Sequence, residues 1–215
     1  MKLGLPYRDR SEAGRILAEK LADYGARTDL VVLGLTKGGV PVAAAVADAL
    51  GAPLDVVVVA KLGAPAQPEL EIGAIAADGV RVLDEDLIRA LSLPPVAVDG
   101  IARRELADLE RCERFYRSRH AALDLRERTV ILVDDGVATQ LSMLAALRFV
   151  RKQAPRQVVL AAPVAAARAL ELSRHEVDDC VCPAVPEPFF SVASWYWNFP
   201  LITDAEVTRL LEMRR

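Results

Sequence analysis

The sequence predicts an α/β fold, a doubly wound parallel sheet with an inserted hairpin and a small C-terminal hood. Residues 54–60, which are almost purely Val, and the apolar run 130–133 show no regular alternation with polar residues, which is typical of strands that helices cover on both faces. Segments with helical spacing lie between such runs, so right-handed crossovers can join parallel strands. One Asp-Gly pair between two short apolar runs interrupts this rhythm and predicts a hairpin.

The length, hydrophobic content and charge of the sequence are consistent with a single domain over residues 1–215 and exclude several classes of protein. A chain of 215 residues, 53% of them hydrophobic, can bury a large core. The 27 Lys and Arg residues balance 30 Asp and Glu residues for a net charge of -3, so we expect no nucleic-acid binding. No apolar run reaches the roughly 18 residues of a membrane span, and the N-terminus lacks the apolar core of a signal peptide. We therefore expect a cytoplasmic protein without membrane contact.

Isolated cysteines and histidines give no sign of a metal site. Cys112, Cys180 and Cys182 include no Cys-x-x-Cys pair, which argues against both a disulfide framework and a zinc site. His120 and His175 have no partner at ligand spacing, so we interpret them as surface or helix-end residues.

Apolar spacing, caps and turn residues predict the order of the elements. Helices are expected over residues 11–24 (a surface helix capped by Asp9 or Ser11), 42–50, 84–91, 99–119, 144–150, 164–172 and from Asp204 onward, capped by Thr203 or Asp204 itself. Strands are expected over residues 29–35, 54–60, 130–133, 157–162 and 177–182, and the hairpin over 72–77 and 80–83, joined by Asp78-Gly79.

Three segments carry further expectations. Residues 61–70 hold Gly63, Pro65 and Pro68 among small side chains, which predicts a mobile loop. On the long helix, Glu110/Arg114 and Glu113/Arg117 stand at i,i+4 in the favourable order, which predicts a solvated face. Residues 183–200 are rich in proline and aromatic residues, among them Trp195, Tyr196 and Trp197, which either cover a binding site or form core.

Two adjacent carboxylates, Asp134 and Asp135, directly follow the predicted strand 130–133, and small or hydroxyl-bearing residues dominate positions 136–142. In open α/β sheets ligands bind at the carboxyl ends of the strands, and a helix N-terminus attracts anions. Asp is also common in surface turns after strands, but adjacent carboxylates here are better explained as acceptors for a polyol or a metal-bound ligand. We interpret this stretch as a site for a sugar phosphate.

The segment Val133-Asp134-Asp135-Gly136-Val137-Ala138-Thr139 resembles the phosphoribosyl pyrophosphate (PRPP) motif of the type I phosphoribosyltransferases. Thr36-Lys37-Gly38-Gly39 resembles the pyrophosphate loop of that family, where the peptide before the first glycine is often cis and the basic residue is usually Arg. Residues 61–72 lie where the family has its flexible catalytic loop, and residues 183–203 contribute most of the hood. The resemblance implies Mg²⁺-dependent transfer of ribose 5-phosphate from PRPP to a nitrogenous base, with release of pyrophosphate.

The same resemblance implies a role for each candidate site residue. Lys61, Asp134 and Asp135 would be catalytic. The ribose and 5′-phosphate of PRPP would be bound by Asp134, Asp135, Gly136, Val137, Ala138, Thr139, Gln140 and Ser142. The pyrophosphate would be bound by Lys37, Gly38, Gly39 and Lys61, and the base by Phe189, Phe190 and Trp195. No residue is expected to bind metal directly, because Mg²⁺ would be held through the pyrophosphate and the ribose hydroxyls.

Three departures from the family pattern bear on function. Ser142 replaces the usual Thr and keeps its hydroxyl. Ala138 stands where hypoxanthine-guanine enzymes place an Asp as general base, so that route is unavailable. Gln140 replaces the loop glycine, and if that position needs a positive φ, the side chain costs roughly 1–2 kcal/mol. It could also fill the phosphate pocket.

Two alternatives therefore stay open. One is a catalytically impaired regulatory protein of the same fold that binds PRPP or a nucleotide. The other is a phosphatase-like α/β protein that uses Asp134 or Asp135 on a metal. The expected ligands are PRPP and a nucleobase-like small molecule, and we also expect a homodimer.

Overall fold

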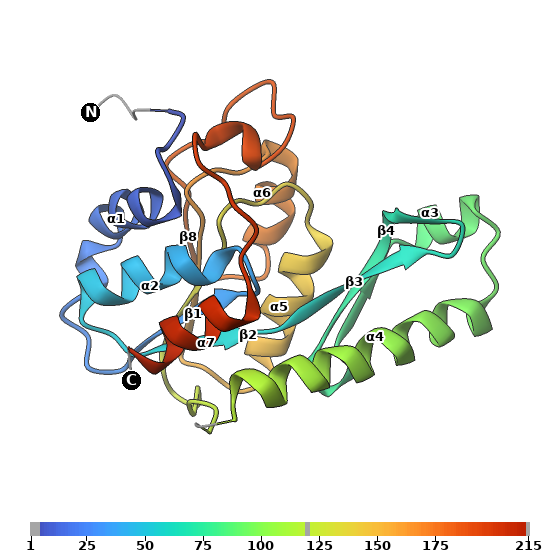
Figure 1. Ribbon diagram of the computed structural model, residues 1–215, viewed down its shortest axis with the longest axis horizontal. Helices are drawn as coiled ribbons and strands as arrows, with labels where there is room; N and C mark the ends of the chain where they lie inside the picture. Colours follow the sequence, from blue (N-terminus) through green and yellow to red (C-terminus); the bar gives the residue numbers. More distant parts are fainter. Residues whose placement is uncertain (1–4, 119–120, 214–215) are drawn as a thin grey trace.

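The computed structural model describes residues 5–118 and 121–213 and contains two β-sheets (Figure 1). Five parallel strands form the central sheet in the order β2-β1-β6-β7-β8, and three antiparallel strands form the second in the order β3-β4-β5. The central strands are β1 (Leu30–Leu35), β2 (Leu54–Val57), β6 (Thr129–Val133), β7 (Gln157–Ala161) and β8 (Asp179–Val181). The second sheet consists of β3 (Val59–Ala64), β4 (Gln67–Ala76) and β5 (Arg81–Leu83).

Seven α-helices and three short 3-10 helices lie in the described residues. The α-helices are α1 (Arg10–Lys20), α2 (Gly39–Leu50), α3 (Glu85–Ala90), α4 (Pro95–Tyr116), α5 (Leu141–Arg151), α6 (Ala167–Arg174) and α7 (Asp204–Glu212). The 3-10 helices are η1 (Ala22–Tyr24), η2 (Ala77–Gly79) and η3 (Ala193–Trp195).

The strand order places a switch point between β1 and β6. From β1 the chain crosses through α2 to β2 on one side, whereas from β6 it crosses through α5 to β7 on the other. Right-handed crossovers in opposite directions put α2 and α5 on opposite faces of the sheet. The loops after β1 and β6 then diverge, which opens a crevice between them. The doubly wound fold is thereby confirmed.

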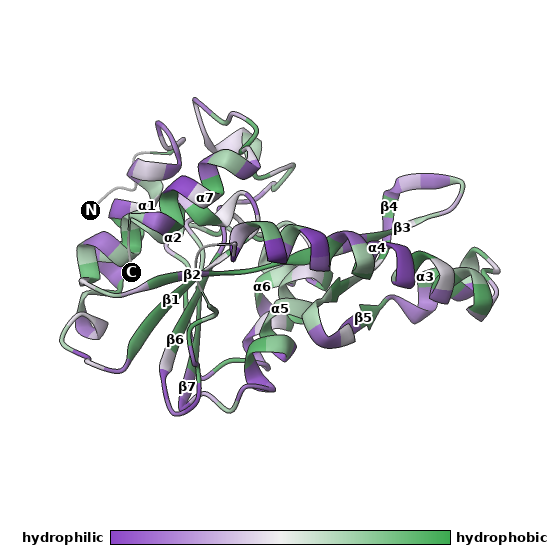
Figure 2. Cartoon of the chain, turned by 60° about the horizontal axis from the view of Figure 1, so that its bottom comes forward, coloured by the Kyte–Doolittle hydropathy of each residue, from purple (hydrophilic) through white to green (hydrophobic). Residues whose placement is uncertain are grey.

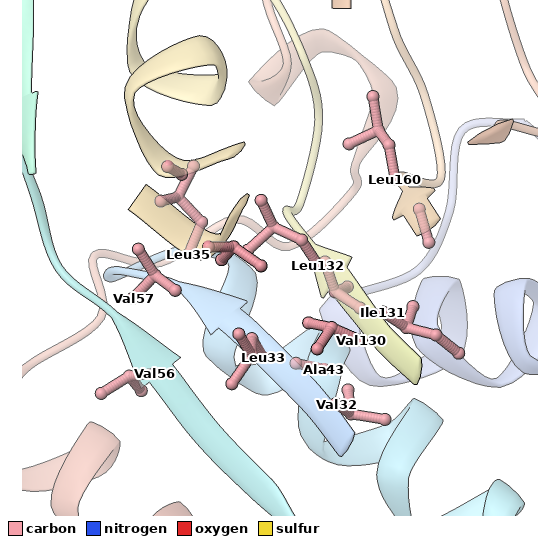
Figure 3. Close-up of a cluster of buried hydrophobic side chains, with 14 of the residues drawn as sticks. Val32, Leu33, Leu35, Ala43, Val56, Val57, Val130, Ile131, Leu132 and Leu160 are labelled. Carbon is pink, nitrogen blue, oxygen red and sulfur yellow. The ribbon is translucent and has the colours of Figure 1, made fainter. Parts of the chain in front are cut away.

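Strands β1, β2 and β6 of the central sheet are buried along their whole length. Every residue of β1 and β6 is buried, and their side chains interlock with those of α2 and β7 (Figure 3). The hydropathy colouring in Figure 2 shows β1, β6 and β7 as apolar stretches inside the molecule. Burial on both faces agrees with the prediction that helices cover both sides of this sheet.

Residues 59–116 form a projection that we call the arm, built from the second sheet, α3 and α4 (Figure 1). The arm has its own hydrophobic cluster, to which all three strands and both helices contribute at least partly buried residues. The buried members are Leu62, Ala64, Ile72, Ile75, Ile88, Val98, Ile101 and Ala102. The predicted hairpin is confirmed as β4 and β5, with Asp78 and Gly79 both at positive φ.

The prediction of a loop over residues 61–70 was wrong. Most of these residues lie in β3 and β4, and only Pro65 and Ala66 separate the two strands. Gly63 marks a shift in the strand register, where an added Cβ would lie 2.3 Å from the Pro68 carbonyl oxygen. The glycine and prolines therefore mark a bulge and a turn rather than an irregular segment.

Other predicted boundaries moved for local reasons. The apolar run 54–60 is split at Val58, where the chain passes from the central sheet into the arm. The helix predicted over residues 164–172 begins only at Ala167, because Val164 and Ala165 pair as bridges with Ala184 and Val137. The long arm helix begins earlier than predicted, at Pro95, a position that suits proline. His120 lies outside the described residues.

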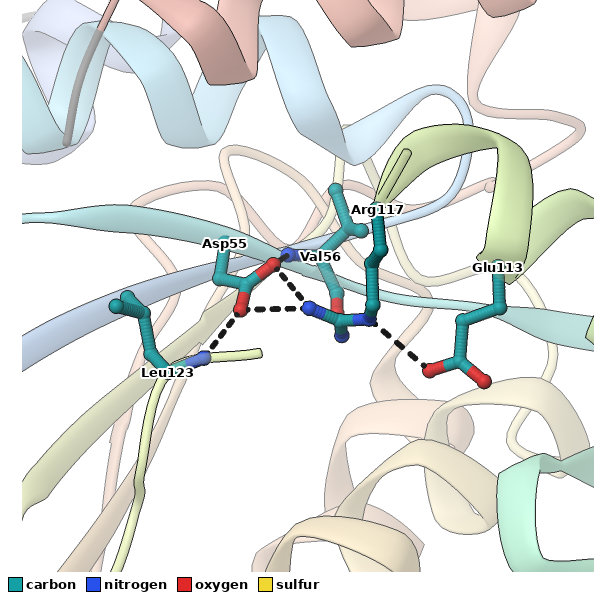
Figure 4. A network of polar contacts seen from close by, with 5 residues as sticks. All are labelled: Asp55, Val56, Glu113, Arg117 and Leu123. Carbon is teal, nitrogen blue, oxygen red and sulfur yellow. Dashed lines mark hydrogen bonds and ion pairs between the residues drawn. The ribbon is translucent and has the colours of Figure 1, made fainter. Parts of the chain in front are cut away.

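The predicted solvated face of α4 was wrong at Arg117, the C-cap of this helix. The Nη1 atom of Arg117 donates to both carboxylate oxygens of Asp55 at 2.9 Å, and Glu113 contacts the Nε atom at 3.4 Å (Figure 4). Only 3% of the Asp55 side chain and 18% of the Arg117 side chain are exposed. By contrast, Arg114 and Glu110 are exposed and 3.8 Å apart, as predicted. The arm helix is thus anchored to β2 by a buried ion pair.

The two ends of the described chain build the hood together. Tyr7 exchanges backbone hydrogen bonds with Trp195 and Trp197 at 2.8 Å, and the Asn198 amide donates to the Arg8 carbonyl oxygen. The Tyr7 side chain is fully buried against Tyr196. The hood of residues 183–203 therefore rests on the segment that leads into α1.

Candidate active site

Two backbones meet at the carboxyl ends of β1 and β6. At Gly38 an added Cβ would lie 2.2 Å from the Asp135 Oδ2 atom, and at Gly39 it would lie 2.5 Å from the Val133 carbonyl oxygen. Only glycine permits so close an approach. The cis peptide in this loop joins Thr36 and Lys37, one residue earlier than the resemblance indicated.

A cavity of about 560 Å³ opens above this junction, at the switch point of the sheet. The predicted site residues in its wall are Lys37, Gly38, Lys61, Asp134, Asp135, Gly136, Ala138, Thr139 and Ser142. Residues of the wall that were not predicted are Arg10, Thr36, Met143, Val192, Phe199, Leu201 and Ile202. Strands β1, β3 and β6, the hood and α1 thus converge on one space.

The carboxyl pair has unequal surroundings. Asp134 accepts the backbone N–H of Asp135 at 2.8 Å, and both burial and the neighbouring charge of Asp135 raise its pKa well above the ordinary value. Burial also raises the pKa of Asp135, but the Arg10 guanidinium opposes that shift. Asp134 is therefore the carboxyl of the pair that more readily holds a proton.

Arg10, in the first turn of α1, is a site residue that the sequence analysis missed. Its Nε atom donates to Asp135 Oδ2 at 2.8 Å, and its Nη1 atom donates to the Pro200 carbonyl oxygen at 2.7 Å. The guanidinium carbon lies 3.7 Å from the centroid of the Phe199 ring. The sequence holds one indication of this role. A cation in the first turn of a helix opposes the helix dipole, so another interaction must favour an arginine at this position.

The loop after the carboxyl pair presents two hydroxyls to the arm. Thr139 Oγ1 donates to Glu71 Oε2 and Ser142 Oγ donates to Glu71 Oε1, each at 3.1 Å. Glu71 lies on β4, and only 10% of its side chain is exposed. Glu71 belongs to the segment 61–72 but is not among the predicted site residues.

Gln140 does not have the geometry that would impair the loop. Its φ is -85° and its ψ is -23°, in the right-handed helical region, at the N-cap of α5. The residue lines a separate groove between the arm and α6 and is not part of the wall of the cavity described above. A side chain at this position therefore needs neither a strained backbone nor space in the phosphate pocket.

Each cationic side chain in the described wall of the cavity contacts a carboxylate. Arg10 pairs with Asp135, the Nζ atom of Lys37 lies 3.0 Å from Asp204 Oδ1, and that of Lys61 lies 3.5 Å from Glu71 Oε2. Lys37 and Lys61 are nonetheless well exposed. Both can turn toward an anion in the cavity.

The residues predicted to bind a base do not line the cavity. Phe189 packs beside Trp195 with ring centroids 6.4 Å apart, and the Phe190 side chain is exposed. Of the other aromatic residues, Tyr196 is buried and donates its hydroxyl to the Asp135 carbonyl oxygen, whereas Trp197 is exposed. The hood side chains in the wall are instead Val192, Phe199, Leu201 and Ile202.

The model of the phosphoribosyl transferase domain family matches residues 9–200, which include the loop of Gly38 and Gly39, the loop that begins at Gly136 and most of the hood. The chain belongs to the phosphoribosyltransferase family. The match covers α1 as well, so the arginine that pairs with Asp135 lies inside the family domain.

Relatives of this chain include proteins of two Mycobacterium tuberculosis strains, CDC 1551 and H37Rv, each described as a "putative phosphoribosyl transferase". They are 45% identical over 205 residues, which is 95% of this chain and 46% of the relative. The chain thus spans about half the length of these relatives.

Among solved structures, TT1426 of Thermus thermophilus is 40% identical, with a TM-score of 0.80 and coverage of 97% of this chain and 98% of that chain. The AQ2163 protein of Aquifex aeolicus, 10% identical with a TM-score of 0.50 over 82% of this chain and 74% of that one, shares the fold alone.

Three further features are the cysteines, His175 and the length of the apolar helices. Cys112, Cys180 and Cys182 form no disulfide, and the exposed His175 is the C-cap of α6. Within residues 5–118 and 121–213, no helix is long and apolar enough to cross a membrane.

Proposed function

We propose that this protein transfers ribose 5-phosphate from PRPP to a nitrogenous base. The observation that carries the proposal is the convergence of the Asp134–Asp135 pair, the Thr139–Ser142 loop and the Lys37 loop on one cavity. A polyol, a phosphate and a pyrophosphate each find suitable partners there. The apolar hood side chains supply a wall for a flat base.

The roles of the residues follow from their chemistry. The carboxylate oxygens of Asp134 and Asp135 that face the cavity accept hydrogen bonds from the ribose hydroxyls and orient the sugar. Lys37 and Lys61 neutralise charge on the leaving pyrophosphate. The bond between C1′ and the pyrophosphate oxygen breaks with its electron pair going to pyrophosphate, and a base nitrogen bonds to C1′ and loses its proton to solvent. Ala138 offers no general base for that proton, in contrast to an Asp.

Magnesium fits this site as an ion that would be held mainly by the phosphates of the bound donor. No group of three or more His, Cys, Asp or Glu side chains suited to a metal occurs in the described residues. Each cation of the wall already has a carboxylate partner, so a highly anionic donor needs further positive charge. Mg²⁺ is commonly held by one or two carboxylates together with substrate phosphates. When bound, it would neutralise the departing pyrophosphate.

Calorimetric titration with PRPP and Mg²⁺, followed by assays of pyrophosphate release with a panel of bases, tests the proposal. We expect binding that weakens at least tenfold in Lys37→Met, which loses about the worth of one charge-assisted contact. Release of pyrophosphate with one base establishes the transferase. If PRPP does not bind, the proposal is rejected.

Binding without turnover for every base would favour the alternative, a regulatory protein of the same fold. Gln140 gives that alternative no support, because it lines a separate groove and is not among the described residues of the cavity wall. A phosphatase-like activity would instead appear as hydrolysis of generic phosphate esters, without any requirement for a base.

A further inference from the structure

The loop of residues 136–142, which we call the phosphate loop, already binds an anion, and that anion is a carboxylate of the protein itself. Glu71 receives hydrogen bonds from Thr139 and Ser142, one to each carboxylate oxygen, and its Oε2 atom lies 3.5 Å from the Lys61 ammonium group. Two loop hydroxyls and one cation are the donors that a phosphate group would require.

We propose that Glu71 competes with the 5′-phosphate of the donor for the phosphate loop, and that its displacement releases Lys61 toward the pyrophosphate. This inference rests on the proposed function, since it concerns the same cavity. Glu71 is then a positioning residue that acts through Lys61, Thr139 and Ser142.

The placement of Glu71 on the arm favours competition over a passive structural contact. Glu71 pairs with Gly63 in the strand register, and Lys61 lies on the same neighbouring strand, β3. The arm therefore supplies both the competing carboxylate and the cation that this carboxylate restrains. The loop hydroxyls come from the other side, at the start of α5, where Gln140 provides no side-chain cap for the helix.

Electrostatics makes the two states mutually exclusive. A carboxylate and a phosphate cannot both accept the same hydroxyl protons, and their like charges repel at that distance. Once phosphate enters, the Glu71 side chain must turn away, and its hold on Lys61 is lost with it. The apparent affinity for the donor is then reduced by the fraction of molecules in which Glu71 occupies the loop.

This relation gives a quantitative expectation. Because the same contact must be broken for every ligand that places a phosphate in the loop, removing the carboxylate should raise the affinities for ribose 5-phosphate and PRPP by a similar factor. For two hydroxyl contacts and one ion pair that factor should be about tenfold or more. A purely structural role would predict weaker binding instead.

The experiment is calorimetric titration of the full chain with ribose 5-phosphate and with PRPP plus Mg²⁺, in wild type, Glu71→Gln and Glu71→Ala. Glu69→Gln is the matched control, because Glu69 lies on the same strand, carries the same charge and is exposed. Urea unfolding of each variant shows that it is folded, and the alanine variant provides a second test if the glutamine variant is not.

The expected result is a tenfold or larger gain in both Glu71 variants and a change below about twofold in Glu69→Gln. The double variant Lys61→Met/Glu71→Gln should likewise bind ribose 5-phosphate more tightly than Lys61→Met, because the competition occurs at the hydroxyls of Thr139 and Ser142. Equal or weaker binding by folded Glu71 variants overturns the inference, and if wild type still binds PRPP the proposed function stands. Failure of every variant and of wild type to bind either ligand overturns both.

Discussion

Among single residues, the carboxyl groups of Asp134 and Asp135 differ in their effect on the stability of the folded protein. Burial raises the pKa of both, but the paired Arg10 guanidinium opposes the shift at Asp135, whereas the charge of Asp135 adds to the shift at Asp134 and holds its pKa well above the ordinary value. A carboxyl whose pKa is raised in the folded state binds its proton more tightly there than in the unfolded chain. Its contribution to stability is therefore present at low pH and is lost as the pH rises through the raised pKa.

Replacing each carboxyl by its amide should have opposite effects on stability. Asp134→Asn cannot ionise, so we expect it to unfold at higher urea concentration than wild type at about pH 8 and at a similar concentration at about pH 4. Asp135→Asn leaves buried Arg10 without its counter-charge, which should cost about 3 kcal/mol or more. Urea unfolding at both pH values measures this. Equal destabilisation by the two amides would contradict the unequal surroundings.

Gln140 provides a second residue-scale prediction. Because its backbone is in the right-handed helical region and the residue lines a different groove, Gln140→Gly should change the affinity for ribose 5-phosphate by less than about twofold. Calorimetric titration of both proteins with ribose 5-phosphate is the measurement. A large gain in affinity would mean that the glutamine obstructs the loop after all.

The sequence could predict those parts of the site that belong to local motifs, which include the loop of Lys37 and Gly38 as well as the stretch from Asp134 to Ser142. Asp134, Asp135 and the loop that follows form a local pattern, so their convergence on one cavity was predictable. Arg10 and Glu71 reach the site from 125 and 68 positions away from their partners Asp135 and Thr139. No spacing in a single sequence marks such pairs, since the fold alone brings them together.

At the scale of elements, the arm shows why turn residues mislead. Gly63, Pro65 and Pro68 predicted a loop, but here they shape a bulge and a tight turn between two paired strands. The apolar core strands were predictable because burial on both faces removes their polar residues. Sheet membership was not predictable, because the Val-rich run 54–60 continues from β2 into the start of β3 and so passes from one sheet into the other.

The ion pair at the end of α4 gives a prediction at this scale. Arg117→Met should destabilise the protein by about 3–5 kcal/mol, because it leaves the Asp55 carboxylate buried without that guanidinium. Arg114→Met, in the exposed pair with Glu110, should change stability by less than about 0.5 kcal/mol. Urea denaturation of both variants is the measurement. Similar losses from the two substitutions would show that the pair with Asp55 is not special.

At the scale of the whole molecule, the site depends on both ends of the described chain. Tyr196 of the hood donates its hydroxyl to the Asp135 carbonyl oxygen, and Tyr7 joins the same cluster from the other end. At Gly136 an added Cβ would lie 2.6 Å from the Val192 side chain, so hood and motif are in close contact. The segment before α1 thus helps to fix the part of the cavity wall that the hood supplies.

Removing that segment should loosen the hood while the sheet stays intact. In a variant lacking residues 1–8, the amides of Trp197 and Asn198 lose their acceptors on Tyr7 and Arg8, so their hydrogen exchange should accelerate by about fivefold or more. A variant lacking only residues 1–4 keeps both acceptors and should exchange like the full chain. Amides of β6 serve as the internal reference, because they are fully buried within the central sheet. If Trp197 and Asn198 keep their protection without residues 1–8, the hood is held by its own contacts and the N-terminal segment does not help to fix the cavity wall.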